Sequence, residues 1–119
     1  MWRSAKCDID KSWLEFDFGQ PQKLSTICIW NYSDTWHTSQ GVRKMSISVW
    51  TQETGWRKIR EEQQIDQAEG SDDYDGPTII KLDAVVAQKV RFDAFTNFGD
   101  PDYVGLSEVQ FFGPTAAGP

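Results

Sequence analysis

Histidine and cysteine are scarce in this sequence of 119 residues, which contains one histidine and two cysteines. A single histidine cannot build the histidine cluster that holds many catalytic metals. The cysteines do not form a CxxC motif, and neither a G-x-S-x-G nucleophile elbow nor a phosphate-binding glycine loop occurs. The carboxylates of the predicted strands show no spacing that selects a catalytic pair. The sequence therefore predicts a protein that is not an enzyme.

The two cysteines, Cys7 and Cys28, allow at most one internal disulfide bond. Two alternatives stay open at this point, since the residues form either that bond or two free thiols buried in the core. Two cysteines are too few to indicate whether the protein works in an oxidising or a reducing compartment.

Long hydrophobic runs and an excess of basic residues are also absent. No run approaches the ~20 apolar residues of a membrane span, and Met1-Trp2-Arg3-Ser4 lacks the apolar region of a signal peptide. Twelve Lys and Arg face eighteen Asp and Glu, which gives a formal net charge of −6. Nucleic-acid binders and polybasic membrane-surface modules both depend on clustered Lys and Arg. We therefore expect neither nucleic acid nor membrane as a partner.

Helical periodicity is nearly absent, and short apolar runs with a period of two dominate instead. Gly, Pro, Asn and Asp separate these runs at intervals of about ten residues, as turns do. Residues 19–21 and 84–87 are expected to be turns. The predicted strands are 13–18, 24–32, 42–51, 56–59, 78–82, 89–95 and 107–112. Seven or so short strands predict an all-β fold, an antiparallel β-sandwich.

The length fits one domain, since domains average roughly 100–150 residues. We expect that domain to cover residues 1–113, followed by a Pro- and Gly-rich linker tail at 114–119. The segment 63–77 is polar and acidic. Its best match to a calcium-binding EF-hand has Leu82 where the glutamate ligand belongs and no flanking helices. A solvated acidic loop is therefore favoured over another kind of cation site.

Three groups of stretches, in this order and at these spacings, resemble one known family. They are 13–19, then 24–31 with 41–49 and 55–56, then 90–92 with 105–112. This combination is similar to the discoidin, or coagulation factor 5/8 type C, domain and to the related family 32 carbohydrate-binding modules. The resemblance covers nearly the whole chain. It implies a galactose-binding-like jelly roll in which loops at one end of the sandwich bind the ligand.

The resemblance also implies a function. It suggests a non-catalytic carbohydrate-binding module whose partner is a glycan, an accessory domain of a larger extracellular protein. The alternative is a protein-interaction or adhesion domain on the same scaffold, because a fold does not dictate a function.

The family has a further stretch ahead of the segment that matches Met1-Trp2-Arg3-Ser4, and this sequence lacks it. We therefore expect a sandwich with a shortened N-terminal segment. The resemblance implies a structural Ca²⁺ in this family, for which Glu108 matches the C-terminal ligand, although such a site needs six to eight oxygens. A missing strand leaves an unpaired edge, which predicts a homodimer through that edge or through strand exchange.

Sugar recognition needs an aromatic ring that stacks on a pyranose and polar groups that bind its hydroxyls. The loop 31–40 carries Trp36 and His37 among polar neighbours, and a second loop carries Asn97 and Phe98. Arg43 follows at the start of a strand. The resemblance implies that Trp36 and Phe98 stack on the sugar while His37, Arg43 and Asn97 bind its hydroxyls. The alternative is that the aromatic rings cover the core and the polar side chains are only solvated.

Overall fold

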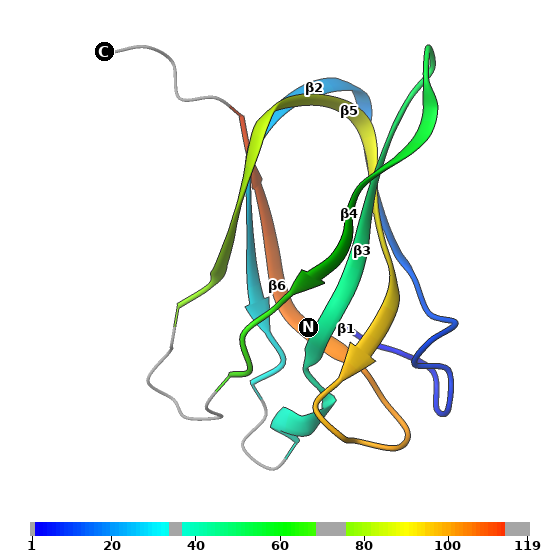
Figure 1. Cartoon of the computed structure of the whole chain (residues 1–119), viewed down its shortest axis with the longest axis vertical. Coiled ribbons are helices and arrows are strands. Elements are labelled where there is room, and N and C mark those ends of the chain that lie inside the picture. The colour runs from blue at the N-terminus through cyan, green and yellow to red at the C-terminus, as the bar shows by residue number, and fades with distance from the viewer. Residues whose placement is uncertain (1, 34–36, 69–75, 114–119) are drawn as a thin grey trace.

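Six antiparallel strands form the protein in the computed structural model, which describes residues 2–33, 37–68 and 76–113 (Figure 1). They are β1 (Trp2–Arg3), β2 (Leu14–Asn31), β3 (Val42–Thr51), β4 (Gly55–Gln64), β5 (Thr78–Asn97) and β6 (Gly105–Phe112). The order across the sheet is β1-β6-β2-β5-β3-β4, and a short 3-10 turn, η1 (Thr38–Gln40), precedes β3. The predicted tail 114–119 lies outside the described residues. Within those residues no helix has the length and apolar character that a membrane crossing requires.

Two long strands turn this one sheet into a sandwich. β2 and β5 arch together over one end of the molecule (Figure 1), and their register shifts between Asp17 and Gln22. On one side of the arch, the first half of β2 pairs with the second half of β5, which pairs with β3, and β3 pairs with β4. On the other side, the second half of β2 lies between the first half of β5 and β6. The predicted antiparallel β-sandwich is thus confirmed, with two layers that are continuous through the arch.

The predictions of turns at 19–21 and 84–87 were wrong. Both segments lie within strands, at the arch, where the chain bends without leaving the sheet. Gly19 (φ 77°) and Ala84 (φ 50°) adopt left-handed backbone angles there, and the Gly19 amide donates to the Asp17 carboxylate at 2.8 Å. A bulge of this kind bends a strand while its pairing resumes on the far side. The predicted strand 56–59 was also too short, because β4 follows β3 as far as Gln64.

The core lies between the two layers and follows the alternation seen in the sequence. Met45, Ile47 and Val49 of β3 are fully buried and pack in one cluster with Ile27 and Ile29 of β2. The inward-facing side chains of a two-layer sandwich supply most of the burial free energy, at roughly 25 cal/mol per Å² of apolar surface. The predicted inward face of β3 is therefore confirmed.

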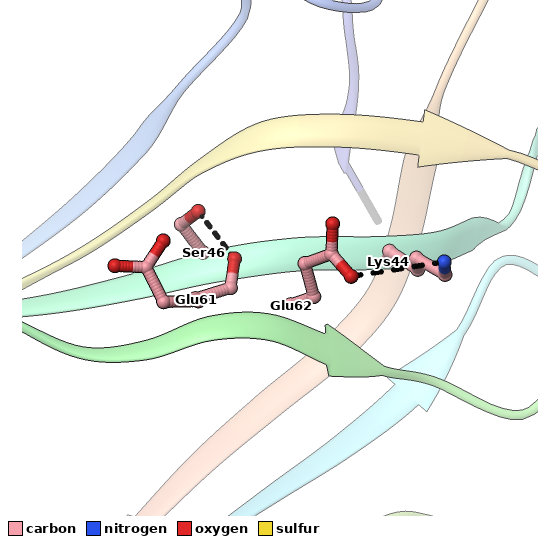
Figure 2. Close-up of polar contacts among 4 residues, drawn as sticks. All are labelled: Lys44, Ser46, Glu61 and Glu62. Carbon is pink, nitrogen blue, oxygen red and sulfur yellow. Dashed lines mark hydrogen bonds and ion pairs between the residues drawn. The ribbon is translucent and has the colours of Figure 1, made fainter.

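Ser46 departs from that alternation, because it is buried although its neighbours on both sides are core residues. The strand pairing of β3 with β4 shifts register at this point. Figure 2 shows the result, in which the Ser46 hydroxyl donates to the backbone carbonyl of Glu61 at 2.8 Å. The buried hydroxyl is thus satisfied by a carbonyl of the irregular neighbouring strand.

Both cysteines are free thiols, so of the two alternatives the disulfide bond is wrong. The expectation that free thiols would be buried is also wrong, since Cys7 is exposed and Cys28 is half-buried. The Cys7 thiol lies 3.5 Å from a carboxylate oxygen of Asp102, and this hydrogen bond, with the charge of Asp102, raises the pKa of Cys7. A raised pKa makes the thiol a poorer nucleophile at neutral pH.

Three connections gather at the end of the sandwich opposite the arch (Figure 1). They join β2 to β3 through η1, β4 to β5, and β5 to β6, and only their parts outside 34–36 and 69–75 are described. This end, which we call the loop end, is where the sequence placed the ligand-binding loops.

Candidate functional site

A shallow hollow of about 270 Å³ opens at the loop end. Its lining comes from the start of β3, the end of β4 with the residues that follow it, and the loop after β5. The lining residues are Arg43, Lys44, Gln64, Ile65, Asp66, Gln67 and Phe98. Two of the predicted ligand-binding residues, Arg43 and Phe98, are far apart in the sequence and share this hollow.

The floor of the hollow is built by backbone pairing. The Ile65 amide donates to the Arg43 carbonyl at 3.0 Å, and the Ile65 side chain is buried in the core. This anchor holds the residues around Ile65 against β3. As a result Asp66 and Gln67, which follow Ile65, line the same hollow as Arg43.

The buried side chain of Asn31 holds the residues around the hollow together by hydrogen bonds to their backbone. Its side chain is 4% exposed, and its amide nitrogen donates to the carbonyls of Val42 (2.8 Å) and Asp66 (2.9 Å). Its amide oxygen accepts from the backbone amides of Tyr32 (2.9 Å) and Val42 (2.8 Å). A Cβ at position 41 would lie 2.8 Å from that oxygen, so glycine is required there. One buried side chain thus joins β2, β3 and the floor of the hollow.

The sequence reasoning missed Asn31 as a residue that shapes the site. The available signal was its position, an amide side chain at the end of an otherwise apolar strand. A buried amide at such a point needs several hydrogen-bond partners. Those partners come from segments remote in the sequence, so the position suggests a buried polar group without showing what it joins.

Asn97 shapes the loop that carries Phe98. Its amide nitrogen donates to the carbonyls of Asp100 and Tyr103, each at 2.7 Å, and its oxygen accepts from the Gly99 amide at 3.0 Å. The Phe98 amide in turn donates to the Ser39 carbonyl of η1 at 3.1 Å. Both hydrogens of the Asn97 amide are therefore used within its own loop. Its predicted contact with a sugar stays a prediction, and the structure gives its side chain a positioning role.

Asp100 closes the same loop with its carboxylate. One oxygen accepts from the amides of Asp102 and Tyr103, both at 2.9 Å, and the other accepts from the Gln40 side chain at 3.4 Å. Partial burial acts to raise the pKa of Asp100. The hydrogen bonds from Asp102, Tyr103 and Gln40, with the nearby charge of His37, outweigh burial and lower that pKa below its ordinary value of 3.8.

We expect the order of the loop 97–103 to depend on pH through Asp100. A carboxylate whose pKa is lower in the folded state stabilises that state above its unfolded pKa, and the stabilisation is lost as the pH falls through the folded pKa. The loop should therefore be unchanged from neutral pH down to about pH 4 and loosen below it. Thermal unfolding measured from pH 7 to pH 3 tests this. Asp100→Asn should be less stable at pH 7 and less sensitive to acid, and a wild-type loss of stability centred above pH 5 would contradict the assignment.

His37 and Trp36, both predicted to bind the ligand, differ from Arg43 and Phe98 in what the structure describes of them. His37 is exposed immediately before η1, and its carbonyl accepts from the Gln40 amide at 2.9 Å. It does not line the hollow. Trp36 lies outside the described residues, so its predicted stacking on a sugar stays a prediction.

Lys44 supplies a second cation to the hollow, and Figure 2 shows its ion pair with Glu62 of the neighbouring strand. The two charged atoms lie 3.9 Å apart, and 36% and 75% of the respective side chains are exposed. Exposed pairs of this kind contribute little to stability. The ammonium group can therefore exchange Glu62 for another acceptor at small cost.

The hollow thus combines one aromatic ring with donors and an acceptor for hydrogen bonds. Phe98 is half-buried, while Arg43, Gln64 and Gln67 bring donor groups and Asp66 a carboxylate. An apolar surface beside a few polar groups is the composition that holds and orients a small polar ligand.

Glu108, the predicted calcium ligand, lies on β6 and is exposed. In the described part of the chain no three His, Cys, Asp or Glu side chains gather closely enough to hold a metal ion. A calcium ion takes six to eight oxygens, mostly from carboxylates and carbonyls. The calcium site at Glu108 therefore stays a prediction.

The family model of the F5/8 type C domain matches residues 1–109 of this chain. No curated protein is similar enough in sequence to count as a relative.

Solved structures provide several similar folds. A family 89 glycoside hydrolase from Clostridium perfringens is 28% identical over 94% of this chain, with a TM-score of 0.67. This chain spans only 11% of that enzyme. The module CBM32-3 of a family 31 glycoside hydrolase from the same organism is 19% identical (TM-score 0.70), with 95% of this chain and 74% of the module covered. A family 32 carbohydrate-binding module of Streptococcus pneumoniae EndoD is 12% identical (TM-score 0.68), with coverages of 95% and 75%.

Proposed function

This chain belongs to the F5/8 type C domain family, and on that basis we propose that it is a non-catalytic module that binds a glycan at its loop end. The observation that carries the proposal is the hollow shared by Arg43 and Phe98. Phe98 stacks on the apolar face of a pyranose ring, and Arg43 with its polar neighbours binds the hydroxyls. His37 and Trp36, on the adjoining loop, are candidates for further contacts, and Asn97 holds Phe98 in place.

The same proposal includes a setting for the module. Its matching region in the family 89 glycoside hydrolase is a small part of a large enzyme. We infer that this chain likewise acts as an accessory domain of a larger extracellular protein and concentrates it on a glycan surface. A single open hollow buries little area, so the affinity is expected to be weak, roughly 10 µM to 1 mM. Several copies on one protein or one surface would compensate.

The alternative, a protein-interaction or adhesion domain, would need a flat apolar patch at the loop end. Five of the seven lining residues of the hollow are instead charged or carry amides. That composition supports a hydroxyl-rich ligand over an apolar protein surface.

A glycan array tests the proposal. Wild-type protein is compared with the double variant Arg43→Ala/Phe98→Ala, with Trp36→Ala, and with Trp56→Ala as a control. Trp56 is 43% exposed on β4, and it does not line the hollow. We expect one class of glycan to bind wild type and Trp56→Ala but not the double variant. A loss with Trp36→Ala would add its loop to the site, and folded wild type that binds no glycan would contradict the proposal.

A further inference from the structure

A second hollow lies at the end of the sandwich opposite the loop end, between the tip of the β3–β4 hairpin and the arch of β2 and β5 (Figure 1). Its volume is about 690 Å³, against 270 Å³ for the hollow at the loop end. It is lined by residues 51–54 and Arg57 of the hairpin, by Pro21 of β2, and by Val86 and Gln88 of β5. This arch-end hollow shares no residue with the proposed glycan site.

The polar side chains of the arch-end hollow stand on the face of the sheet that is apolar elsewhere. Val49 of β3 is fully buried and pairs with Val90 of β5 on one side and with Arg57 of β4 on the other. Directly paired residues point to the same face of a sheet, so Arg57 points to the core side although it is exposed. Alternation places Gln88, two residues before Val90, on that face as well. Next to these two valines, the core-side face therefore carries an arginine and an amide.

The hairpin tip that forms one wall is held by its own hydrogen bonds. The Thr51 and Thr54 hydroxyls lie 2.7 Å apart, and the Thr54 amide donates to the Thr51 hydroxyl at 3.2 Å. The Thr54 hydroxyl donates to the Gly55 carbonyl at 3.1 Å. These hydroxyls are engaged within the turn and fix its shape. The polar groups of this hollow that a ligand can use are therefore its arginine, its glutamate and its two glutamines.

The other arginines of the described residues indicate why Arg57 is unusual. Arg3 and Arg91 lie over aromatic rings, and Arg60 donates to two backbone carbonyls. Arg43 and Arg57 have no such partner within the described residues, and each of them lines a hollow. Three arginines thus serve the packing of the protein itself, while these two present their guanidinium groups to a space that a ligand can enter.

The chemistry of the lining indicates the class of ligand. The guanidinium of Arg57 presents paired N–H donors that match the two oxygens of a carboxylate. The amides of Gln52 and Gln88 both donate and accept, as neighbouring hydroxyls require. Pro21 and Val86, which is 41% exposed, supply an apolar wall. We propose that the arch-end hollow binds a saccharide unit that carries a carboxylate, as a second binding site separate from the loop end.

Glu53 is the one carboxylate of this hollow, and it leaves Arg57 accessible to an acid. The two charged side chains are exposed and form no ion pair in the described structure, so a ligand displaces no protein carboxylate when it reaches the guanidinium. Glu53 itself accepts hydrogen bonds from sugar hydroxyls. Because the two hollows lie at opposite ends of the sandwich, the module holds two saccharide units at once if the loop end also binds one.

A titration followed by NMR tests the proposal. The probes are methyl β-D-glucuronide, methyl β-D-glucoside with a hydroxymethyl group in place of the carboxylate, and acetate. We expect the glucuronide to shift the side-chain Nε–H signal of Arg57 and the side-chain amides of Gln52 and Gln88. Its Kd should be roughly millimolar and about tenfold lower than that of either other probe. Acetate that binds as tightly would reveal an adventitious ion only, and a glucuronide that shifts only signals around Phe98 would place the acid at the loop end. Either result overturns the proposal.

Arg57→Gln and Lys58→Gln form a matched pair of variants. They remove the same charge from neighbouring residues of β4, but Lys58 pairs with Ser48 on the opposite face and does not line the hollow. We expect Arg57→Gln to abolish the shifts at the glutamine amides and Lys58→Gln to keep the wild-type Kd. Arg57→Lys, which keeps the charge without the fork, should bind several-fold more weakly than wild type. Thermal unfolding shows that each variant is folded. Equal weakening by Arg57→Gln and Lys58→Gln, or full binding by Arg57→Gln, would overturn the proposal.

Discussion

Replacing Asn31 by alanine is expected to lower the free energy of unfolding by about 2–5 kcal/mol, because buried groups that lose their only partner cost about 1–3 kcal/mol each. The Asn31 side chain binds two carbonyls and two amides. All four lie around a residue that is 4% exposed, so water reaches them poorly. Urea unfolding of wild type and variant measures the loss.

Ser46→Ala is the matched control for this prediction. Ser46 is as buried as Asn31 and also lies in a strand, but its side chain makes one hydrogen bond to a carbonyl. Its removal should cost about 1 kcal/mol. If Asn31→Ala destabilised the protein no more than Ser46→Ala, the four-bond network would not hold the loop end together as described.

Phe98→Ala is expected to weaken glycan binding about tenfold or more, with little effect on stability. A stacked aromatic ring contributes roughly 0.5–1.5 kcal/mol beyond the area that it buries, and 1.4 kcal/mol corresponds to a factor of ten in Kd. The ring is half-buried at the rim of the hollow, while its backbone is held independently by the Ser39 carbonyl. Titration calorimetry with a glycan selected on the array gives the change in Kd.

Two variants separate stacking from other causes. Phe98→Tyr keeps the ring and should retain most of the affinity. Asn97→Ala keeps Phe98 but removes three hydrogen bonds of its loop, so it should weaken binding by loosening the loop and should also lower the melting temperature. Unchanged affinity of Phe98→Ala would place the glycan elsewhere.

Much of the fold could be predicted from alternation, and the part that could not depends on pairing between distant segments. Met45, Ile47 and Val49 showed their inward direction in the sequence because a buried face repeats every second residue. Gly19 and Pro21 look like a local turn. That they lie inside a continuous strand depends on the second half of the arch, more than half the chain away, which no local pattern shows.

The candidate site likewise has a part that could be predicted from the sequence and a part that could not. Arg43 and Phe98 could be named from residue type and resemblance, and they share the hollow. Gln64 and Gln67 were assigned to a solvated loop because the segment 63–77 is polar and acidic, whereas β4 continues to Gln64 and both residues line the hollow. The roles of Asn31 and Asn97 were out of reach, since an amide side chain in a sequence does not show which backbone groups will surround it.

The arch of β2 and β5 makes folding slow and leaves few stable, partly folded states. Partners such as Ile27 and Ile80, or Phe16 and Val90, are remote in the chain, and the entropy of closing such loops is lost before any pairing is gained. Chains dominated by contacts of this kind fold in milliseconds to seconds. Because each of these strands belongs to both layers, neither layer can form fully before the other and cover the other's apolar face. Until the arch forms, the apolar faces of both layers are exposed together, and in that interval the chain is most prone to aggregation.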